Sequence, residues 1–155
     1  MASSTPYLKT AIVLLAEDNP AEQRLAQRAL ARGKISCDLR IVADGEEAMD
    51  YLLRRKRYVD PKQAPRPDLM LLDLNMPKLD GRQVLQQMKS VPQLAIIPVV
   101  VLTTSQQEQD ILQSYQLGCN SFIKKPVDVH AFIDTMISLG LYWFHLVVLP
   151  PRKEE

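Results

Sequence analysis

The segment that decides the fold reads Asp68-Leu69-Met70-Leu71-Leu72-Asp73-Leu74-Asn75-Met76-Pro77. Its four apolar residues between two aspartates predict a short strand that is buried on both faces. A charge inside such a run would be costly to bury, so we place Asp73 at the carboxyl end of the strand. Pro77 holds the preceding residue extended and cannot continue a sheet ladder, so the chain turns there.

Similar apolar runs lie on either side of this segment. We expect further strands at 11–16, 39–43, 99–102 and 121–124, each followed by a stretch with helical periodicity. Five β–α units in alternation predict an α/β fold, a doubly wound parallel sheet of five strands with helices on both faces. We adopt the flavodoxin-like strand order 2-1-3-4-5 for such a sheet.

Local signals set the expected helix boundaries. Asn19 is an N-cap residue with Glu22 three positions later, as in a capping box. We expect this helix to run to about Gly33, with an inner face of Leu25, Ala29 and Leu30. Further helices are expected after Asp44, from Asp80-Gly81, over about 107–117 and from about Asp128.

The second of these helices has a distinct carboxyl end. Its apolar stripe would be formed by Ala48, Met49, Leu52 and Leu53, and the basic run Arg54 to Arg57 would close it and interact with the helix dipole. The segment from Tyr58 to Pro67 carries three prolines and is expected to be a long loop.

Composition narrows the class of protein. The chain has 155 residues and a net charge of +1, which fits one domain and gives no sign of a nucleic-acid partner. Cys37 and Cys119 have no metal-ligand spacing, and no run approaches the ~20 apolar residues of a membrane span. We expect a cytoplasmic protein with an N-terminal extension at 1–10, a domain at 11–141 and an apolar C-terminal extension with a charged tail at 142–155.

Chemically suggestive residues follow four of the five strands: Glu17 and Asp18, Asp73, Thr103 and Lys125. In the adopted order these four strands are neighbours, so their carboxyl ends should meet at one rim. Clustered carboxylates repel one another unless a cation joins them, and hard oxygen ligands suit Mg²⁺. A lysine and a hydroxyl beside an aspartate can bind phosphoryl oxygens, and an aspartate can itself attack a phosphoryl group.

These motifs, with Asp73-Leu74-Asn75-Met76-Pro77 and Lys125-Pro126, resemble the receiver domain of two-component response regulators over nearly the whole chain. The resemblance implies that Asp73 accepts a phosphoryl group from a sensor histidine kinase. It implies that Asp18, Glu17, Asp73 and the backbone carbonyl of Asn75 bind Mg²⁺. It also implies that Thr103 and Lys125 bind the phosphoryl group, and that the Lys125-Pro126 bond is cis.

The same resemblance suggests regulatory positions. Phe122 falls where the family has an aromatic switch residue coupled to Thr103, and Asn75 and Ser105 fall where residues modulate dephosphorylation. Ala16 to Pro20, the 58–67 loop and Leu102 to Ser105 are most similar to the single-domain regulators paired with cyanobacterial phytochrome kinases. The expected output is protein contact, with an unknown downstream protein.

Other classes of protein share part of this pattern. A phosphohydrolase with an aspartate nucleophile shares the chemistry, but that family has a second aspartate where this chain has Asn75. A flavodoxin-like electron carrier would need a phosphate loop where Glu17 and Asp18 lie. A phosphorelay intermediate or phosphate sink stays open. The apolar run Leu141 to Leu149, with Tyr142, Trp143 and Phe144, predicts a homodimer interface, and the alternative is that it folds back onto the core.

Overall fold

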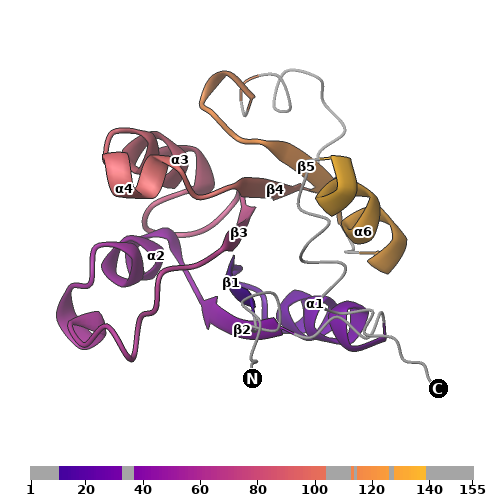
Figure 1. Cartoon of the computed structure of the whole chain (residues 1–155), viewed down its shortest axis with the longest axis horizontal. Helices are drawn as coiled ribbons and strands as arrows, with labels where there is room; N and C mark the ends of the chain where they lie inside the picture. Colours follow the sequence, from indigo (N-terminus) through magenta and orange to yellow (C-terminus); the bar gives the residue numbers. More distant parts are fainter. Residues whose placement is uncertain (1–10, 33–36, 104–112, 114, 126–127, 139–155) are drawn as a thin grey trace, which may run out of the picture.

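The computed structural model describes residues 11–32, 37–103, 113, 115–125 and 128–138. Its centre is a parallel sheet of five strands in the order β2-β1-β3-β4-β5 (Figure 1). The strands are β1 (Ala11–Ala16), β2 (Cys37–Val42), β3 (Leu69–Asp73), β4 (Val99–Thr103) and β5 (Ser121–Lys124). The α/β fold and the strand order expected from the sequence are confirmed.

Strand register brings the functional ends of the sheet together. Along adjacent strands, Ala16 pairs with Leu72, Asp73 pairs with Leu102, and Thr103 pairs with Lys124. The carboxyl ends of β1, β3, β4 and β5 therefore reach nearly the same level. Side chains that follow these strands share one edge of the sheet, which is the edge where parallel α/β folds place their chemistry.

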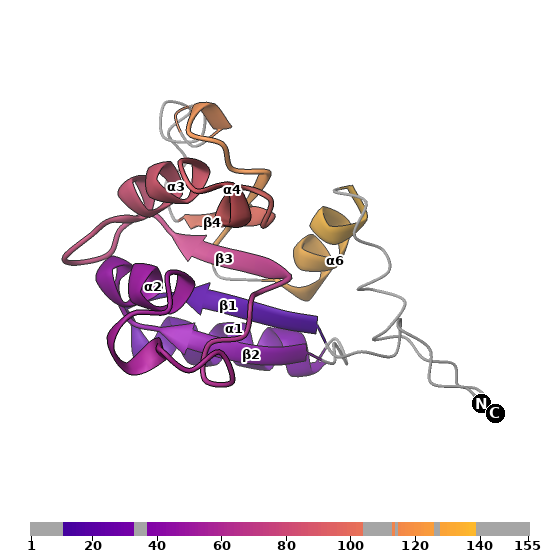
Figure 2. The same cartoon turned by 60° about the vertical axis from the view of Figure 1, so that its left-hand side comes forward.

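Two hydrophobic layers hold the sheet. On one face, Met49, Leu85 and Met88 belong to a cluster beneath α2 (Gly45–Leu52), α3 (Gly81–Lys89) and α4 (Pro92–Ala95). On the other face, Leu30 and Phe132 belong to a cluster beneath α1 (Pro20–Arg32) and α6 (Val129–Ser138). Figures 1 and 2 show these two groups of helices on opposite faces of the strands. Every residue of β3 and β4 is buried, as expected for strands covered on both faces.

Capping side chains fix the loops at the functional edge. The Asp80 side chain accepts hydrogen bonds from the backbone N–H groups of Arg82 and Gln83, and the Gln83 side chain accepts one from the Asp80 backbone N–H. This capping box sets where the β3–α3 loop ends and α3 begins. Asp44 caps α2 by accepting a 2.7 Å hydrogen bond from the Glu47 backbone.

Some local expectations are wrong. Leu25 is 42% exposed, and Ala26 with Leu30 forms the inner face of α1 instead. Leu53 is 37% exposed because α2 ends at Leu52. The expected basic helix end at 54–57 is a turn with φ of 55° at Arg54, followed by a short 3₁₀ helix at Lys56–Tyr58.

The connections also differ in detail. The second strand begins at Cys37 rather than at position 39, and the sequence reading missed the single-turn helix α4. The 58–67 segment is a loop, and side chains attach it to α2: Tyr51 donates to the Pro65 carbonyl at 2.7 Å and Arg54 donates to the Ala64 carbonyl at 3.1 Å. The helix expected over 107–117 falls largely outside the described residues.

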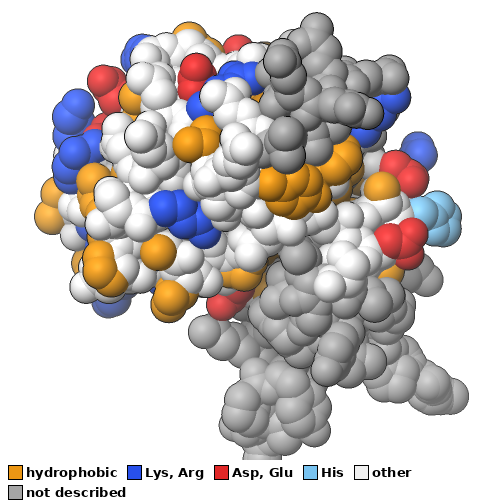
Figure 3. Space-filling model, turned by 90° about the horizontal axis from the view of Figure 1, so that it is seen from above, with side chains coloured by type: hydrophobic (Ala, Val, Ile, Leu, Met, Phe, Trp, Pro, Cys, Tyr) orange, Lys and Arg blue, Asp and Glu red, His pale blue; other side chains and the backbone are white. Residues whose placement is uncertain are grey.

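The surface of the described part has a mixed character. In the view of Figure 3, basic, acidic and hydrophobic side chains are interspersed, and no charge of one sign dominates. None of the helices in the described ranges combines the length and apolarity needed to cross a membrane.

Candidate functional site

Three carboxylates gather at the carboxyl edge of the sheet. Glu17 and Asp18 follow β1, and Asp73 ends β3; one oxygen of each lies within 4.8 Å of the others. Glu17 is 1% exposed, Asp73 is buried, and Asp18 is exposed. The Glu17 backbone N–H donates to the Val42 carbonyl at 3.0 Å, which carries strand pairing one residue past β1 and holds this side chain inward.

Lys125 stands at the centre of the cluster. Its Nζ lies 2.6 Å from Glu17 Oε1, 3.0 Å from Glu22 Oε1 and 3.2 Å from Asp73 Oδ2. The lysine side chain is only 7% exposed. Its backbone N–H donates to the Thr103 carbonyl at 2.9 Å, so the end of β4 fixes where the lysine leaves β5. The structure thus brings together residues that follow β1, β3 and β5.

The two oxygens of Asp73 have different surroundings. Oδ1 accepts a 3.2 Å hydrogen bond from the Asn75 backbone N–H, while Oδ2 faces Lys125. The adjacent loop is held by the Gly81 N–H, which donates to the Leu74 carbonyl at 2.9 Å. One oxygen of the Asp73 carboxylate is therefore held by its own loop, and the other is paired with a cation.

The site carries more negative than positive charge. The pKa of Glu17 is raised to about 7, mainly by burial; the contact with Lys125 opposes this shift, and the neighbouring Asp73 adds to it. Burial also raises the pKa of Asp73, against the attraction of Lys125. Burial alone would lower the pKa of Lys125, but hydrogen bonds to Glu17 and Glu22 outweigh it and raise that pKa.

The donor set fits a divalent cation. Each of the three carboxylates offers one hard oxygen ligand, and Asp18 is open to water. Glu17 Oε1 is fully buried, and the partner found for it among the described residues is the Lys125 ammonium, 2.6 Å away. A second positive charge would relieve the repulsion that one ammonium leaves among these carboxylates. Asp18, Asp73 and Glu17 would hold such an ion.

Sequence reasoning missed one member of the cluster. Glu22 was expected to complete a capping box with Asn19, but the Asn19 backbone N–H donates to Glu17 Oε2 at 3.2 Å instead. The Asn19 side chain still caps α1, accepting from Ala21 at 2.8 Å and Glu22 at 3.2 Å. The Glu22 carboxylate is thereby left to reach Lys125. Its place in the first turn of α1, directly after the acids that follow β1, was the available signal.

Thr103 and Phe122 lie on the same face of the sheet. Val101, two residues before Thr103, belongs to the core beneath α2 and α3, and Phe122 packs against that same core. Because Val101 pairs with Phe122 in register, Thr103 is the diagonal neighbour of Phe122 on β4. Phe122 is half-buried and meets Tyr115 edge-on, with 6.2 Å between ring centroids.

Several expected residues cannot be placed. Ser105, Pro126 with the expected cis bond, and Tyr142, Trp143 and Phe144 lie outside the described residues.

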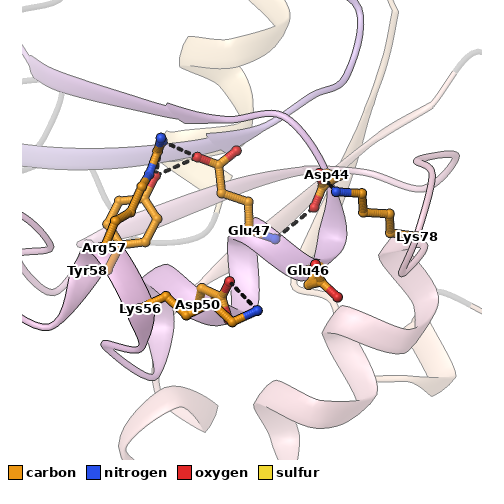
Figure 4. A pocket seen from close by; sticks show the side chains of 8 residues that line it. All are labelled: Asp44, Glu46, Glu47, Asp50, Lys56, Arg57, Tyr58 and Lys78. Carbon is orange, nitrogen blue, oxygen red and sulfur yellow. Dashed lines mark hydrogen bonds and ion pairs between the residues drawn. The ribbon is translucent and has the colours of Figure 1, made fainter.

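A second group of charges lines an open pocket between α2, the 3₁₀ helix and the β3–α3 loop (Figure 4). Three of its four acids have partners: Asp44 pairs with Lys78, Glu47 pairs with Arg57 and Tyr58, and Asp50 pairs with Lys56. Since these charges compensate one another, this pocket is a poorer candidate for a reactive site than the rim around Asp73.

Comparisons with known proteins agree with this geometry. The family model described as the response regulator receiver domain matches residues 13–137. Response regulator Rcp1 of Synechocystis sp. (strain ATCC 27184 / PCC 6803 / Kazusa) is 41% identical over 139 residues, which span 90% of this chain and 92% of Rcp1. A solved structure of the Mn²⁺-bound form of Rcp1 superposes with a TM-score of 0.70 at 38% identity, covering 94% of this chain and 99% of that one.

Two other solved structures are similar. The bacteriophytochrome response regulator RtBRR has a TM-score of 0.79 and 41% identity, covering 87% of this chain and 81% of its own. The phosphorylated cyanobacterial phytochrome response regulator RcpA has a TM-score of 0.72 and 45% identity, covering 89% and 95%. With its fold, its carboxylate rim and these relatives, the chain belongs to the family of response regulator receiver domains, signalling proteins that bind a divalent metal and work with histidine kinases.

Proposed function

We propose that Asp73 is the phosphoryl acceptor of this receiver. The observation that carries the proposal is the placement of its carboxylate, buried at the end of β3 with Oδ2 opposite Lys125 and beside two further acids. Oδ1 is held by the Asn75 N–H, so the carboxylate is oriented before a donor arrives.

The transfer itself balances simply. An Asp73 oxygen forms a bond to phosphorus, while the bond from phosphorus to the donor's imidazole nitrogen breaks and that nitrogen keeps the electron pair. Lys125 then offers its ammonium to the phosphoryl oxygens, and Thr103, buried at the end of β4, offers a hydroxyl. Most of the catalysis is positioning and charge neutralisation, as in phosphoryl transfer generally.

We propose that the resident metal is Mg²⁺, held by Asp18, Asp73 and Glu17 with the Asn75 backbone carbonyl as a further ligand. Three carboxylates at the edge of a sheet, one of them open to solvent, suit an ion that retains waters and binds phosphate oxygens. When bound, the ion neutralises charge on the phosphoryl group. The Mn²⁺ in the Rcp1 structure supports a site for a small divalent cation.

We propose a phytochrome-type histidine kinase as the phosphodonor. The support is the similarity to RtBRR and RcpA, which are a bacteriophytochrome and a cyanobacterial phytochrome response regulator. Initial phosphotransfer rates from a phytochrome kinase and from unrelated histidine kinases would test this pairing. Equal or slower transfer from the phytochrome kinase would refute it.

The proposed output is binding of an unknown downstream protein by the phosphorylated state, in the cytoplasm. Catalysis is limited to self-phosphorylation and slow self-dephosphorylation, with Asn75 and Ser105 setting the phosphate lifetime. A phosphohydrolase is disfavoured because Asn75 cannot act as a general acid. A phosphorelay intermediate would instead pass the phosphoryl group to a second histidine-containing protein.

We also propose homodimerisation through Tyr142, Trp143 and Phe144. Light scattering over a dilution series, with and without beryllofluoride, tests it on the intact chain. A monomer at tens of micromolar in both conditions would rule the dimer out.

The central test replaces Asp73 with Asn. Wild-type protein with Mg²⁺ and a small phosphodonor should incorporate acid-labile phosphate, and Asp73→Asn should incorporate none. Asp134→Asn, an exposed acid on α6, is the matched control and should label like the wild type. Full labelling of Asp73→Asn would refute the assignment.

A further inference from the structure

Each of the three N–H donors of the Lys125 ammonium has a carboxylate available to it. A protonated lysine has three N–H donors, and three carboxylates lie within 3.2 Å of this one. Two of them, Glu17 and Asp73, belong to the acidic cluster. The third is Glu22, which comes from the first turn of α1 and is not part of that cluster.

The start of α1 holds Glu22 in place. The Asn19 cap fixes the first turn through the backbone of Ala21 and Glu22. One residue further on, Gln23 donates from Nε2 to the Glu17 carbonyl at 2.7 Å, which ties the same turn to the end of β1. The approach of Glu22 to Lys125 is therefore set by the backbone and by a neighbouring side chain.

Bonding to phosphorus neutralises the Asp73 carboxylate, so its own lysine donor passes to the phosphoryl group. The other two donors stay with Glu17 and Glu22, and the lysine can give the phosphoryl oxygens a second donor only if one of these two ion pairs is released. Glu17 is almost fully buried, and leaving its carboxylate without a partner would be costly. The Glu22 side chain is 31% exposed, so water can replace the lysine there. Of these two pairs, the Glu22 pair is the easier one to break.

We propose that Glu22 is a positioning residue that holds Lys125 in the resting state and competes with the phosphoryl group for it. The inference rests on the proposed function, because it assumes that Asp73 carries the phosphoryl group. In this arrangement the first turn of α1 lowers the affinity of the site for a phosphoryl-like anion.

Beryllofluoride, which stands in for the phosphoryl group, provides the test. Its affinity is measured at saturating Mg²⁺ for the wild type, Glu22→Gln and Glu22→Asp. Glutamine removes the charge, whereas aspartate keeps the charge but is one methylene too short for the 3.0 Å contact. A partly exposed ion pair lost from the resting state should raise the affinity about threefold. Both variants should show this rise and stay folded, with a urea midpoint lowered only slightly by the lost ion pair.

Glu22→Gln and Glu22→Asp together distinguish the effect of the ion pair with Lys125 from the effect of negative charge alone. If Glu22 acted only by repelling an anion, Glu22→Asp would bind beryllofluoride like the wild type, and the proposal would be wrong. Glu46→Gln, an exposed acid in the first turn of α2, makes the same change in net charge and should have no effect. A rise as large in Glu46→Gln would also overturn the proposal.

Asp73→Asn distinguishes this inference from the proposed function. If the wild type binds beryllofluoride and Asp73→Asn does not, the acceptor site stands. Wild-type affinity in both Glu22 variants would then refute only the role of Glu22. If Asp73→Asn binds beryllofluoride as the wild type does, or the wild type binds none, both proposals fail together.

Discussion

Gly81 lies where α3 begins, pressed against the end of β3, where Asp73 lies. A Cβ built on it would overlap the Asp73 carbonyl oxygen and stand 2.8 Å from the Leu74 Cα. Both neighbours are backbone atoms, so no side-chain rotation can relieve the contact. Gly81→Ala should therefore move the strand end that carries the Asp73 carboxylate, the proposed phosphoryl acceptor.

The size of this effect follows from the distances. Carbon atoms in contact lie about 3.5–4.0 Å apart, so the new methyl group and the Leu74 Cα must separate by about 0.7 Å or more. Overpacking of this kind destabilises a protein by about 1–3 kcal/mol, and we expect the upper end because backbone must move. A misplacement near 1 Å can slow a positioned reaction by about 100-fold, so we expect a loss of at least about tenfold in phosphorylation rate.

Two measurements on one variant provide the assay. Urea unfolding gives the change in stability, and phosphate uptake from a small donor with Mg²⁺, well below the unfolding transition, gives the rate. Gly118→Ala is the matched control. Gly118 has φ of +105°, where an alanine is strained by about 1–2 kcal/mol, and the atoms nearest its new methyl group belong to the flexible Lys89 side chain. This control should lose stability and keep a near wild-type rate.

The comparison can fail in a clear way. If Gly81→Ala is folded and accepts phosphate at the wild-type rate, the end of β3 tolerates displacement and the reasoning is wrong. If Gly118→Ala slows phosphorylation equally, the loss reflects general destabilisation rather than movement of the acceptor.

Other predictions concern pH, capping and switching. Burial raises the pKa of Tyr51 to about 12 from an ordinary value of 10, so the neutral phenol stabilises the fold below pH 10 and this contribution is lost as pH rises from 10 to 12. The unfolding free energy of Tyr51→Phe should fall less steeply over that interval. If the two slopes match, another group titrates there. Asp80→Ala removes the cap of α3 and should lower stability by about 1 kcal/mol in urea unfolding, whereas an unchanged midpoint would mean that the cap contributes nothing. A fluorine label at Phe122 should shift when beryllofluoride and Mg²⁺ are added, because the phosphoryl mimic draws Thr103 inward and vacates space for the ring. An unchanged fluorine signal would argue against a switch that couples Thr103 to Phe122.

The sequence by itself determined the layered fold and the composition of the rim. Apolar runs such as Val99 to Leu102 are short and uninterrupted, so only strands buried on both faces suit them. The carboxylates and the lysine had to follow these runs, because charge is excluded from their interior. Alternation with helical segments then makes the strands parallel, and parallel strands bring such residues to one edge.

Tertiary structure decided which charges meet and which helix faces are buried. By sequence alone, Glu22 is a good capping partner for Asn19. In the fold, the Asn19 N–H donates to Glu17 instead. The Glu22 carboxylate then pairs with Lys125, which is distant from it in the sequence. Leu25 likewise belongs to an apolar pattern but faces outward, since the rotation of α1 is fixed by the packing of Ala26 and Leu30 on the sheet. Local propensity depends on residues that are neighbours in the sequence, whereas an ion pair or a packed helix face depends on groups that only folding brings within a few ångströms.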